Sequence, residues 1–188
     1  MNTRLSITAR LPRAAGARGF TLVELCVGVG LGAALLSQAV PSFQQMREQQ
    51  RLRAEAEVLA SDLRFARSEA ARLHTDLVLR ISGKGSQACY VLHTGANGDC
   101  DCSGGQPVCR APGAEIIKSH ALPAGAGLTL SSNVETMRYQ YRQGLVTPAG
   151  SLNLGLRDGS TIRQVVAVSG RARSCYVGAP VSGLPKCR

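Results

Sequence analysis

The sequence predicts an α+β protein in which one long N-terminal helix precedes a domain of short β-strands. An apolar run at residues 19–43 is followed by residues 44–74, where apolar side chains recur at helical spacing. After His74 the pattern changes to short alternating or β-branched runs that glycine and proline interrupt, which is typical of strands. A chain of 188 residues has room for one such domain, which we place at residues 75–188.

The apolar run is long enough to cross a membrane. Residues 20–43 form about 24 residues of helix, or roughly 36 Å, against a hydrocarbon core of about 30 Å. The leader before them, residues 1–19, carries four arginines and no acidic residue. Because positive charge is retained in the cytoplasm, we expect a single-pass inner-membrane protein with its N-terminus in the cytoplasm and its C-terminal domain in the periplasm.

One acidic residue, Glu24, lies inside the apolar run. A charged side chain at this depth costs on the order of 3 kcal/mol, so it needs a partner or a functional reason. Cleavage between Gly19 and Phe20 would create an amine on Phe20 at the same membrane depth. We expect the amine of a neighbouring subunit to neutralise Glu24 during assembly.

At these residues the sequence resembles the type IV prepilins, whose hallmark is a basic leader, Gly before the cut, Phe after it and Glu at the fifth mature position. The segment Arg18-Gly19-Phe20-Thr21-Leu22-Val23-Glu24 has this pattern. The resemblance implies that a prepilin peptidase cuts after Gly19 and methylates Phe20, and that other pilin or pseudopilin subunits are partners. Two alternatives remain: ordinary signal peptidase cutting after Ser37-Gln38-Ala39, and an uncleaved single-span anchor.

The helix is expected to continue beyond the membrane as an amphipathic segment, residues 44–74. Pro41 should kink it by removing one hydrogen bond. Spacings of four and three give one narrow apolar stripe that can pack on a sheet, and Val58 and Phe65 are expected to widen it. The stripe consists of Leu52, Ala56, Leu59, Leu63, Ala66, Ala70 and Leu73. The charged residues, among them Asp62 and Arg67, are expected mostly on a solvated face.

Eight strands are predicted after the helix, separated by turn-forming residues. They are residues 76–81, 87–93, 114–120, 127–130, 134–142, 151–156, 162–168 and 173–177. Residues 94–112, between the second and the third predicted strand, are loop-like in composition and rich in cysteine. A loop this long is unusual in a compact domain, and disulfides would offset its entropy.

Six cysteines follow the helix, and Cys26 lies in the membrane run as a small packing residue. An even number of cysteines in an exported domain indicates up to three disulfides, whose pairing the sequence alone leaves open. They are Cys89, Cys100, Cys102, Cys109, Cys175 and Cys187. We favour Cys175 with Cys187, because both lie in the tail far from the other four. The alternative is a metal site of Cys100, Cys102 and Cys109 with His93 or His120, although Cys-x-Cys is not the usual zinc spacing.

Two further segments resemble the GspH/FimT branch of minor pilins and pseudopilins. One is Leu63-Arg64-Phe65-Ala66-Arg67-Ser68-Glu69-Ala70 at the end of the helix. The other is Val165-Val166-Ala167-Val168-Ser169-Gly170-Arg171-Ala172-Arg173, which is similar to that branch's closing strand and its Gly-Arg-x-Arg element. The resemblance implies a long helix packed on antiparallel sheet, in a low-abundance subunit of a type IV pilus or a type II secretion pseudopilus. FimT-like members bind DNA through Gly-Arg-x-Arg during natural transformation.

The residue chemistry of the tail agrees with DNA binding. Residues 159–188 contain no acid, and alternation places Arg171 and Arg173 on one face of an extended segment. Paired guanidinium groups suit contacts to the phosphates of double-stranded DNA. The candidate DNA-binding residues are Arg163, Gly170, Arg171, Arg173, Lys186 and Arg188, with Tyr176 nearby. The alternative is a solvated basic tail that aids solubility or docks on an acidic neighbour, in a purely structural subunit that primes or caps a pseudopilus.

The sequence gives no indication of catalysis. We find no nucleophile with a base, no paired carboxylates and no phosphate-binding loop, and residues 83–85 form a turn rather than a Walker motif. We expect neither a cofactor nor a metal.

Overall fold

The computed structural model describes residues 19–83 and 85–188. The basic leader with its four arginines lies outside these residues, as do the side chains of Gln38 and Ala39 at the alternative cleavage site. The chain divides into two compact units, residues 1–42 and residues 43–188, and helix α1 (Leu22–Leu73) contributes to both.

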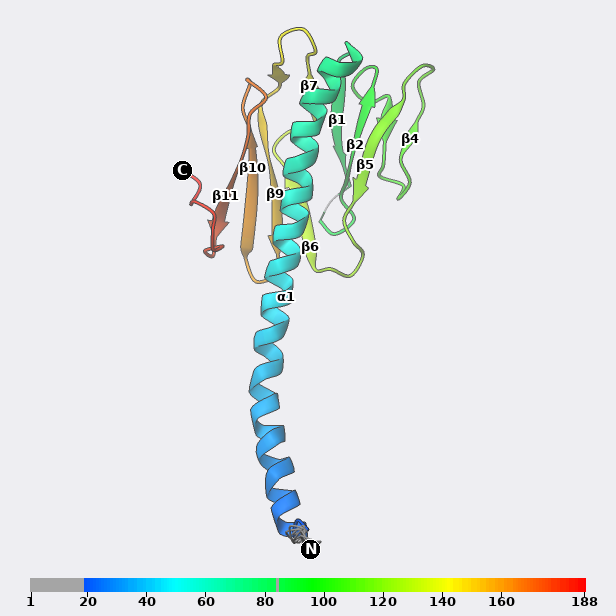
Figure 1. Cartoon of the computed structure of the whole chain (residues 1–188). Helices are drawn as coiled ribbons and strands as arrows, with labels where there is room; N and C mark the ends of the chain where they lie inside the picture. The colour runs from blue at the N-terminus through cyan, green and yellow to red at the C-terminus, as the bar shows by residue number, and fades with distance from the viewer. Residues whose placement is uncertain (1–18, 84) are drawn as a thin grey trace, which may run out of the picture. The chain divides into compact units, whose positions relative to one another are not determined.

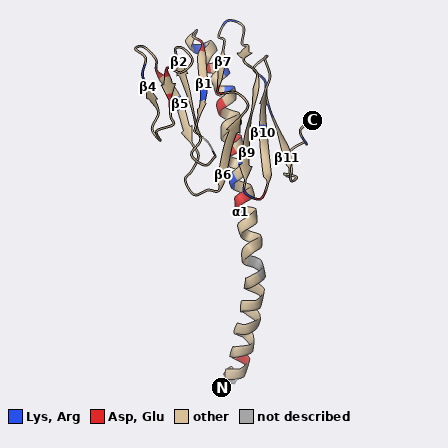
Figure 2. Cartoon of the chain, turned by 180° about the vertical axis from the view of Figure 1, so that it is seen from behind, with Lys and Arg blue, Asp and Glu red and all other residues tan. Residues whose placement is uncertain are grey.

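In the first unit, the described residues form the beginning of α1. The backbone N–H of Glu24 donates to the Oγ1 of Thr21 over 3.2 Å, so Thr21 caps the helix. The apolar side chains here are exposed within the chain, up to 81% for Phe20. No charged residue follows Glu24 until Arg47 (Figure 2). Such a surface requires lipid or other chains to cover it, and α1 is the one helix within the described residues that is long and apolar enough to span a membrane.

The helix continues through Pro41, and in the second unit it buries the predicted stripe. Leu52, Leu59, Leu63 and their alanine neighbours are almost completely buried. Val58 and Phe65 do not widen this stripe: 38% and 36% of their surface is exposed, so this prediction was wrong. The helix ends at Leu73 because His74 adopts a left-handed conformation with φ of 52°.

Two antiparallel sheets follow, and all eight predicted strands are present. The first sheet has the order β5-β2-β1-β7-β8, and the second has the order β11-β10-β9-β6. The strands of the first sheet are β1 (Leu77–Ser82), β2 (Cys89–Thr94), β5 (Ile116–Ala121), β7 (Thr136–Tyr139) and β8 (Val146–Thr147). Those of the second are β6 (Leu128–Ser132), β9 (Gly150–Leu156), β10 (Ser160–Val166) and β11 (Ala172–Gly178).

The second half of α1 packs on both sheets and closes the core between them (Figure 1). Towards the first sheet, the hydroxyl of Tyr90 donates to Asp62 over 2.7 Å. Towards the second sheet, Gln164 Nε2 donates to the carbonyl of Ala56 over 3.0 Å. Asp62 is therefore buried, with 4% exposure, and not on the solvated face expected from the sequence. It also accepts from Lys118 Nζ over 2.5 Å, which satisfies its charge.

The cysteine-rich loop contains two short strands that the sequence analysis did not predict. They are β3 (Cys100–Asp101) and β4 (Val108–Cys109), which form an antiparallel hairpin. Disulfides join Cys89 to Cys102 and Cys100 to Cys109. Because these bonds use all three thiolates of the alternative metal site, that interpretation was wrong. His120, one of the two histidines of that alternative site, instead contacts α1, with its Nε2 2.8 Å from Glu55 Oε2.

The C-terminal tail folds back beside β11. Its third disulfide joins Cys175 to Cys187, the favoured pairing. Tyr176 donates its N–H to the carbonyl of Pro185 over 2.9 Å and accepts from the N–H of Cys187 over 3.0 Å. The tail thus covers the outer edge of the second sheet.

Candidate functional site

The candidate DNA-binding residues gather around the β10–β11 hairpin. The hairpin turn is closed by the N–H of Gly170, which donates to the carbonyl of Ala167 over 2.8 Å. Gly170 has φ of 73°, a left-handed conformation that glycine adopts without a side-chain penalty. The turn delivers Arg171 directly into β11, and both Arg171 and Arg173 are exposed.

Strand register places further cations on the same face as Arg173. Directly paired residues of antiparallel strands share a face, and β10 pairs Val165 with Arg173 and Arg163 with Cys175. Arg163 and Arg173 are therefore diagonal neighbours on the sheet face opposite to α1. The Nε of Arg163 donates to Asn153 Oδ1 over 2.7 Å, which orients its guanidinium along this face.

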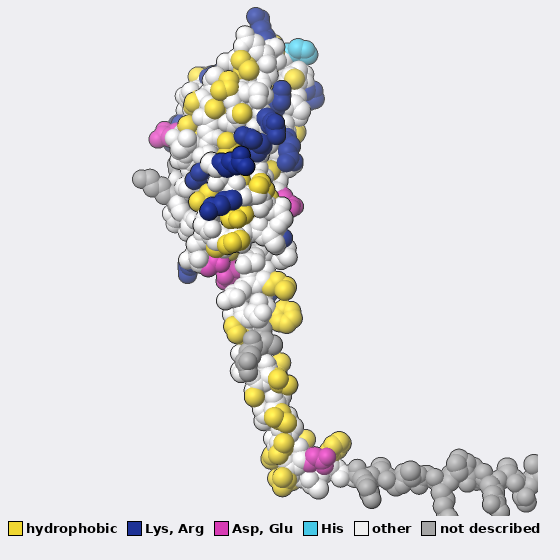
Figure 3. Space-filling view, turned by 90° about the vertical axis from the view of Figure 1, so that its left-hand side faces the viewer, with side chains coloured by type: hydrophobic (Ala, Val, Ile, Leu, Met, Phe, Trp, Pro, Cys, Tyr) yellow, Lys and Arg dark blue, Asp and Glu magenta, His cyan; other side chains and the backbone are white. Residues whose placement is uncertain are grey.

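The disulfide at Cys175 brings the basic tail to the same place. Cys175 lies on the face of Arg163 and Arg173, and its bond to Cys187 holds the tail against β11, where Lys186 pairs with Tyr176 at the edge of the sheet. Lys and Arg side chains gather on this side of the domain (Figure 3). We call the group Arg163, Arg171, Arg173, Lys186 and Arg188 the basic surface. Within the described residues, no carboxylate lies within 4.0 Å of any of its side-chain nitrogens.

Two other elements meet the hairpin turn and were not singled out by the sequence analysis. The end of the loop between β7 and β8 is held next to it, because the N–H of Val146, the first residue of β8, donates to the carbonyl of Val168 over 2.7 Å. This loop carries Arg142, whose Nε donates to the Tyr141 hydroxyl over 2.7 Å, and this bond raises the pKa of Arg142. The other element is α1, from which Arg67 reaches the turn.

Tyr176 does not belong to the basic surface. It alternates with Arg173 and Cys175 along β11, so it points to the opposite face, where it packs against the hydrophobic core. Its role is therefore in packing on the core side of the sheet.

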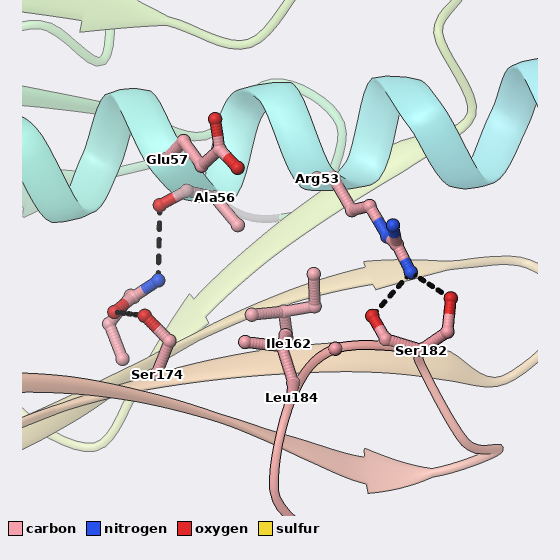
Figure 4. Close-up of a pocket in the computed structure, with 9 residues that line it drawn as sticks. Arg53, Ala56, Glu57, Ile162, Ser174, Ser182 and Leu184 are labelled. Carbon is pink, nitrogen blue, oxygen red and sulfur yellow. Dashed lines mark hydrogen bonds between the residues drawn. The ribbon is translucent and has the colours of Figure 1, made fainter.

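A cavity of about 260 Å³ lies between α1, β10 and the tail (Figure 4). Arg53 crosses it and donates to both the carbonyl and the hydroxyl of Ser182. On the other side, the Ser174 hydroxyl donates to Gln164 Oε1 over 2.8 Å. The bonds of Arg53 fasten the tail to the helix, whereas the bond of Ser174 joins β11 to β10.

The remaining groups with shifted pKa values lie away from the basic surface. Burial raises the pKa of Tyr90, with a contribution from its hydrogen bond to Asp62, and burial lowers the pKa of His93. The nearby Ser82 hydroxyl and the hydrogen bond from Ser103 Oγ, over 2.7 Å, hold the pKa of Asp101 well below its usual range. These groups belong to the helix–sheet contact and the disulfide-bonded hairpin.

Comparison with known proteins identifies the family. The sequence matches the family model described as Type II transport protein GspH over residues 55–171. The chain belongs to the GspH family. The predicted resemblance is therefore confirmed, and the matched part of this GspH-family chain includes both the end of α1 and the turn at Gly170.

The GspH-family fold also matches solved pilin structures. Crystal structures of the type IV minor pilin FimU of Pseudomonas aeruginosa in two space groups are similar to this chain, with TM-scores of 0.51 and 0.50. Identity is 20% and 17%, and the match covers 73% and 71% of this chain and 95% and 96% of FimU. This likeness confirms the predicted α+β pilin fold. Among curated proteins the sequence finds no match.

Proposed function

We propose that this chain is a minor subunit of a type IV pilus or a type II secretion pseudopilus that also binds double-stranded DNA on its basic surface. Membership of the GspH family and the FimU-like fold support the subunit role. The long apolar helix fits a protein anchored in the inner membrane, and we propose that residues 20–43 span it with the folded domain in the periplasm.

Assembly is proposed to depend on Glu24 and on the amine created at Phe20. Phe20 lies just before α1 and Glu24 lies in its first turn, where the neighbouring side chains are apolar and exposed. A carboxylate in such surroundings gains most from a positively charged partner, because the low dielectric of lipid strengthens the attraction. A prepilin peptidase that cuts after Gly19 would supply this partner on each subunit.

The Glu24→Ala variant tests this role. We expect the variant chain to reach the membrane with a folded domain and to be lost from sheared filaments, measured by immunoblotting of the filament fraction. The matched change Glu48→Ala alters an exposed acid on the same helix outside the apolar run, and it should leave incorporation intact. Normal incorporation of Glu24→Ala would refute the proposed contact.

DNA binding is supported by one observation, the convergence of Arg163, Arg171 and Arg173 on one face of the second sheet, beside the disulfide-fixed tail and with no carboxylate within 4.0 Å among the described residues. Arginines without an internal ion pair are available to phosphates and need no carboxylate to be displaced. Such contacts release counterions, so binding should be strongly salt-dependent and show little sequence preference.

The experiment is a fluorescence-anisotropy titration of a labelled mixed-sequence duplex with the full chain in non-ionic detergent, at several salt concentrations. Replacing both Arg171 and Arg173 by Gln should lower the slope of log K against log salt by about 1.8, since each phosphate contact contributes about 0.9. Arg157→Gln is a control of the same kind, because it removes an exposed arginine at the opposite end of β10.

Two results would refute DNA binding at this surface. One is a wild-type chain with no affinity for the duplex at low salt, and the other is an affinity unchanged by the double substitution. Either result would favour the alternative function, a structural subunit whose basic surface docks on an acidic neighbour in the filament. That alternative keeps the Glu24 contact and assigns no role to DNA.

A further inference from the structure

The side chain of Arg67 lies across two glycines at the base of the β10–β11 hairpin. A Cβ placed on Gly170 would be 3.1 Å from Arg67 Cδ and 3.3 Å from its Nε. A Cβ placed on Gly144, in the loop between β7 and β8, would be 3.4 Å from Arg67 Nη2. Arg67 therefore occupies a slot between the two glycines, and a side chain on Gly170 would crowd it.

Both glycines also have backbone conformations that favour glycine. Their φ angles are 63° at Gly144 and 73° at Gly170, in the left-handed region. The carbonyl oxygen of Gly144 would lie 3.0 Å from a Cβ on Gly170, so the two backbones approach each other closely beside the arginine. The slot is consequently narrow, and it restricts where the stem of Arg67 can lie.

Although its stem is confined, Arg67 is an exposed residue. Within the described residues, its guanidinium forms no ion pair. Two acids of α1 that face the first sheet already have partners there: Asp62 is bonded to Lys118, and Glu55 is bonded to His120. Arg67 thus adds an uncompensated positive charge next to the residue that precedes Arg171.

We propose that Arg67 is part of the DNA-binding site and contacts a phosphate adjacent to those bound by Arg171 and Arg173. This inference rests on the proposed DNA binding and extends the basic surface from the sheet onto α1. The slot orients Arg67 before DNA arrives, so less side-chain entropy is lost on binding than for a free surface arginine. Because the two-glycine slot holds Arg67 in place, its guanidinium can contact a phosphate at a fixed position, which a freely moving arginine on a solvated helix cannot do.

The test uses the anisotropy titration of the full chain in detergent, with Arg67→Met, Arg67→Lys and the control Arg51→Met. Met retains a long apolar stem in the slot and removes the charge, whereas Lys retains the charge. Arg51 is exposed on the same helix, about 24 Å away at the rise of an α-helix. We expect Arg67→Met to lower the salt slope by about 0.9 and the affinity about eightfold at roughly 0.1 M salt. Arg67→Lys should retain most of the affinity, and Arg51→Met should change nothing.

The possible failures are distinguishable. If the double substitution of Arg171 and Arg173 weakens binding and Arg67→Met does not, the role of Arg67 is refuted and the proposed function stands. If Arg67→Met and Arg67→Lys weaken binding equally with an unchanged salt slope, Arg67 only shapes the hairpin, which also overturns the inference. If no variant changes the affinity, or no DNA is bound, both proposals fail together. Melting temperatures of all variants confirm that each chain is folded.

Discussion

Substituting alanine at Gly170 tests the geometry on which the site depends. The residue combines two constraints: its φ of 73° lies in the left-handed region, and a Cβ there would meet the Gly144 carbonyl at 3.0 Å and Arg67 Cδ at 3.1 Å. The first constraint costs an L-residue about 1 kcal/mol. The second is a case of overpacking, which adds about 1 kcal/mol or more when a backbone atom is the neighbour.

The chain offers a control that separates these two contributions. Gly125 has a similar φ of 76°, and a Cβ there would meet nothing within 4 Å. Gly125→Ala should therefore destabilise by about 1 kcal/mol from conformation alone, and Gly170→Ala by about 2 kcal/mol from conformation and crowding. At this chain length each kcal/mol lowers the melting temperature by about 2–4 °C.

The assay is thermal unfolding of the full chain in non-ionic detergent, followed by circular dichroism, together with the DNA titration. Gly170→Ala should melt a few degrees below Gly125→Ala, and it alone should weaken DNA binding, because the new methyl group displaces Arg67. Equal melting temperatures for the two variants would show that the slot is not crowded. Unchanged DNA affinity in Gly170→Ala would contradict the proposed position of Arg67.

Three further predictions concern stability. Replacing both Cys175 and Cys187 by Ser opens a loop of 12 residues and should lower the free energy of unfolding by about 3 kcal/mol and weaken DNA binding; no change in either quantity would be evidence against a tail fixed by this bond. Asp62→Ala leaves the buried Tyr90 hydroxyl without its acceptor and should cost about 2 kcal/mol in denaturant unfolding, whereas a neutral effect would contradict the buried hydrogen bond. Because burial lowers the pKa of His93 below the unfolded value of about 6.5, protonation favours the unfolded chain. Stability should fall as the pH drops below about 6.5, and parallel curves of melting temperature against pH for His93→Gln and wild type would refute this.

Long periodic features of the fold could be predicted from the sequence. The stripe on α1 repeats over six intervals, and each main strand contains enough alternating residues to be recognised. The short strands β3, β4 and β8 have two residues each, too few to show a period. Pairing of the first four cysteines also required the structure, because their close spacing permits several arrangements.

The misassigned helix residues share one cause. Periodicity along α1 identifies the buried stripe, but it does not show which neighbours flank it. Asp62 is buried because Tyr90 and Lys118 of the first sheet reach it, whereas Phe65 remains 36% exposed, with the Lys118 ammonium over its ring at 5.6 Å from the centroid. These contacts depend on strands distant in sequence.

The candidate site was predictable only in part. Alternation and charge singled out Arg171 and Arg173, and the structure exposes both of them. Arg67 was not singled out, because the slot lies between Gly144 and Gly170, which follow it by many residues and meet only in the folded domain. The one indication in the sequence was that Arg67 lies in the helix-end segment that resembles the GspH/FimT branch.

The most direct test of the proposed filament subunit is the mass of the mature chain purified from the inner membrane. Cleavage between Gly19 and Phe20 predicts a protein that begins with Phe20 and carries one added methyl group on its amine. A chain that keeps its leader would lack the amine on Phe20 that is proposed to meet Glu24, and a chain cut after Ala39 would lack Glu24 itself. Either mass would contradict the account.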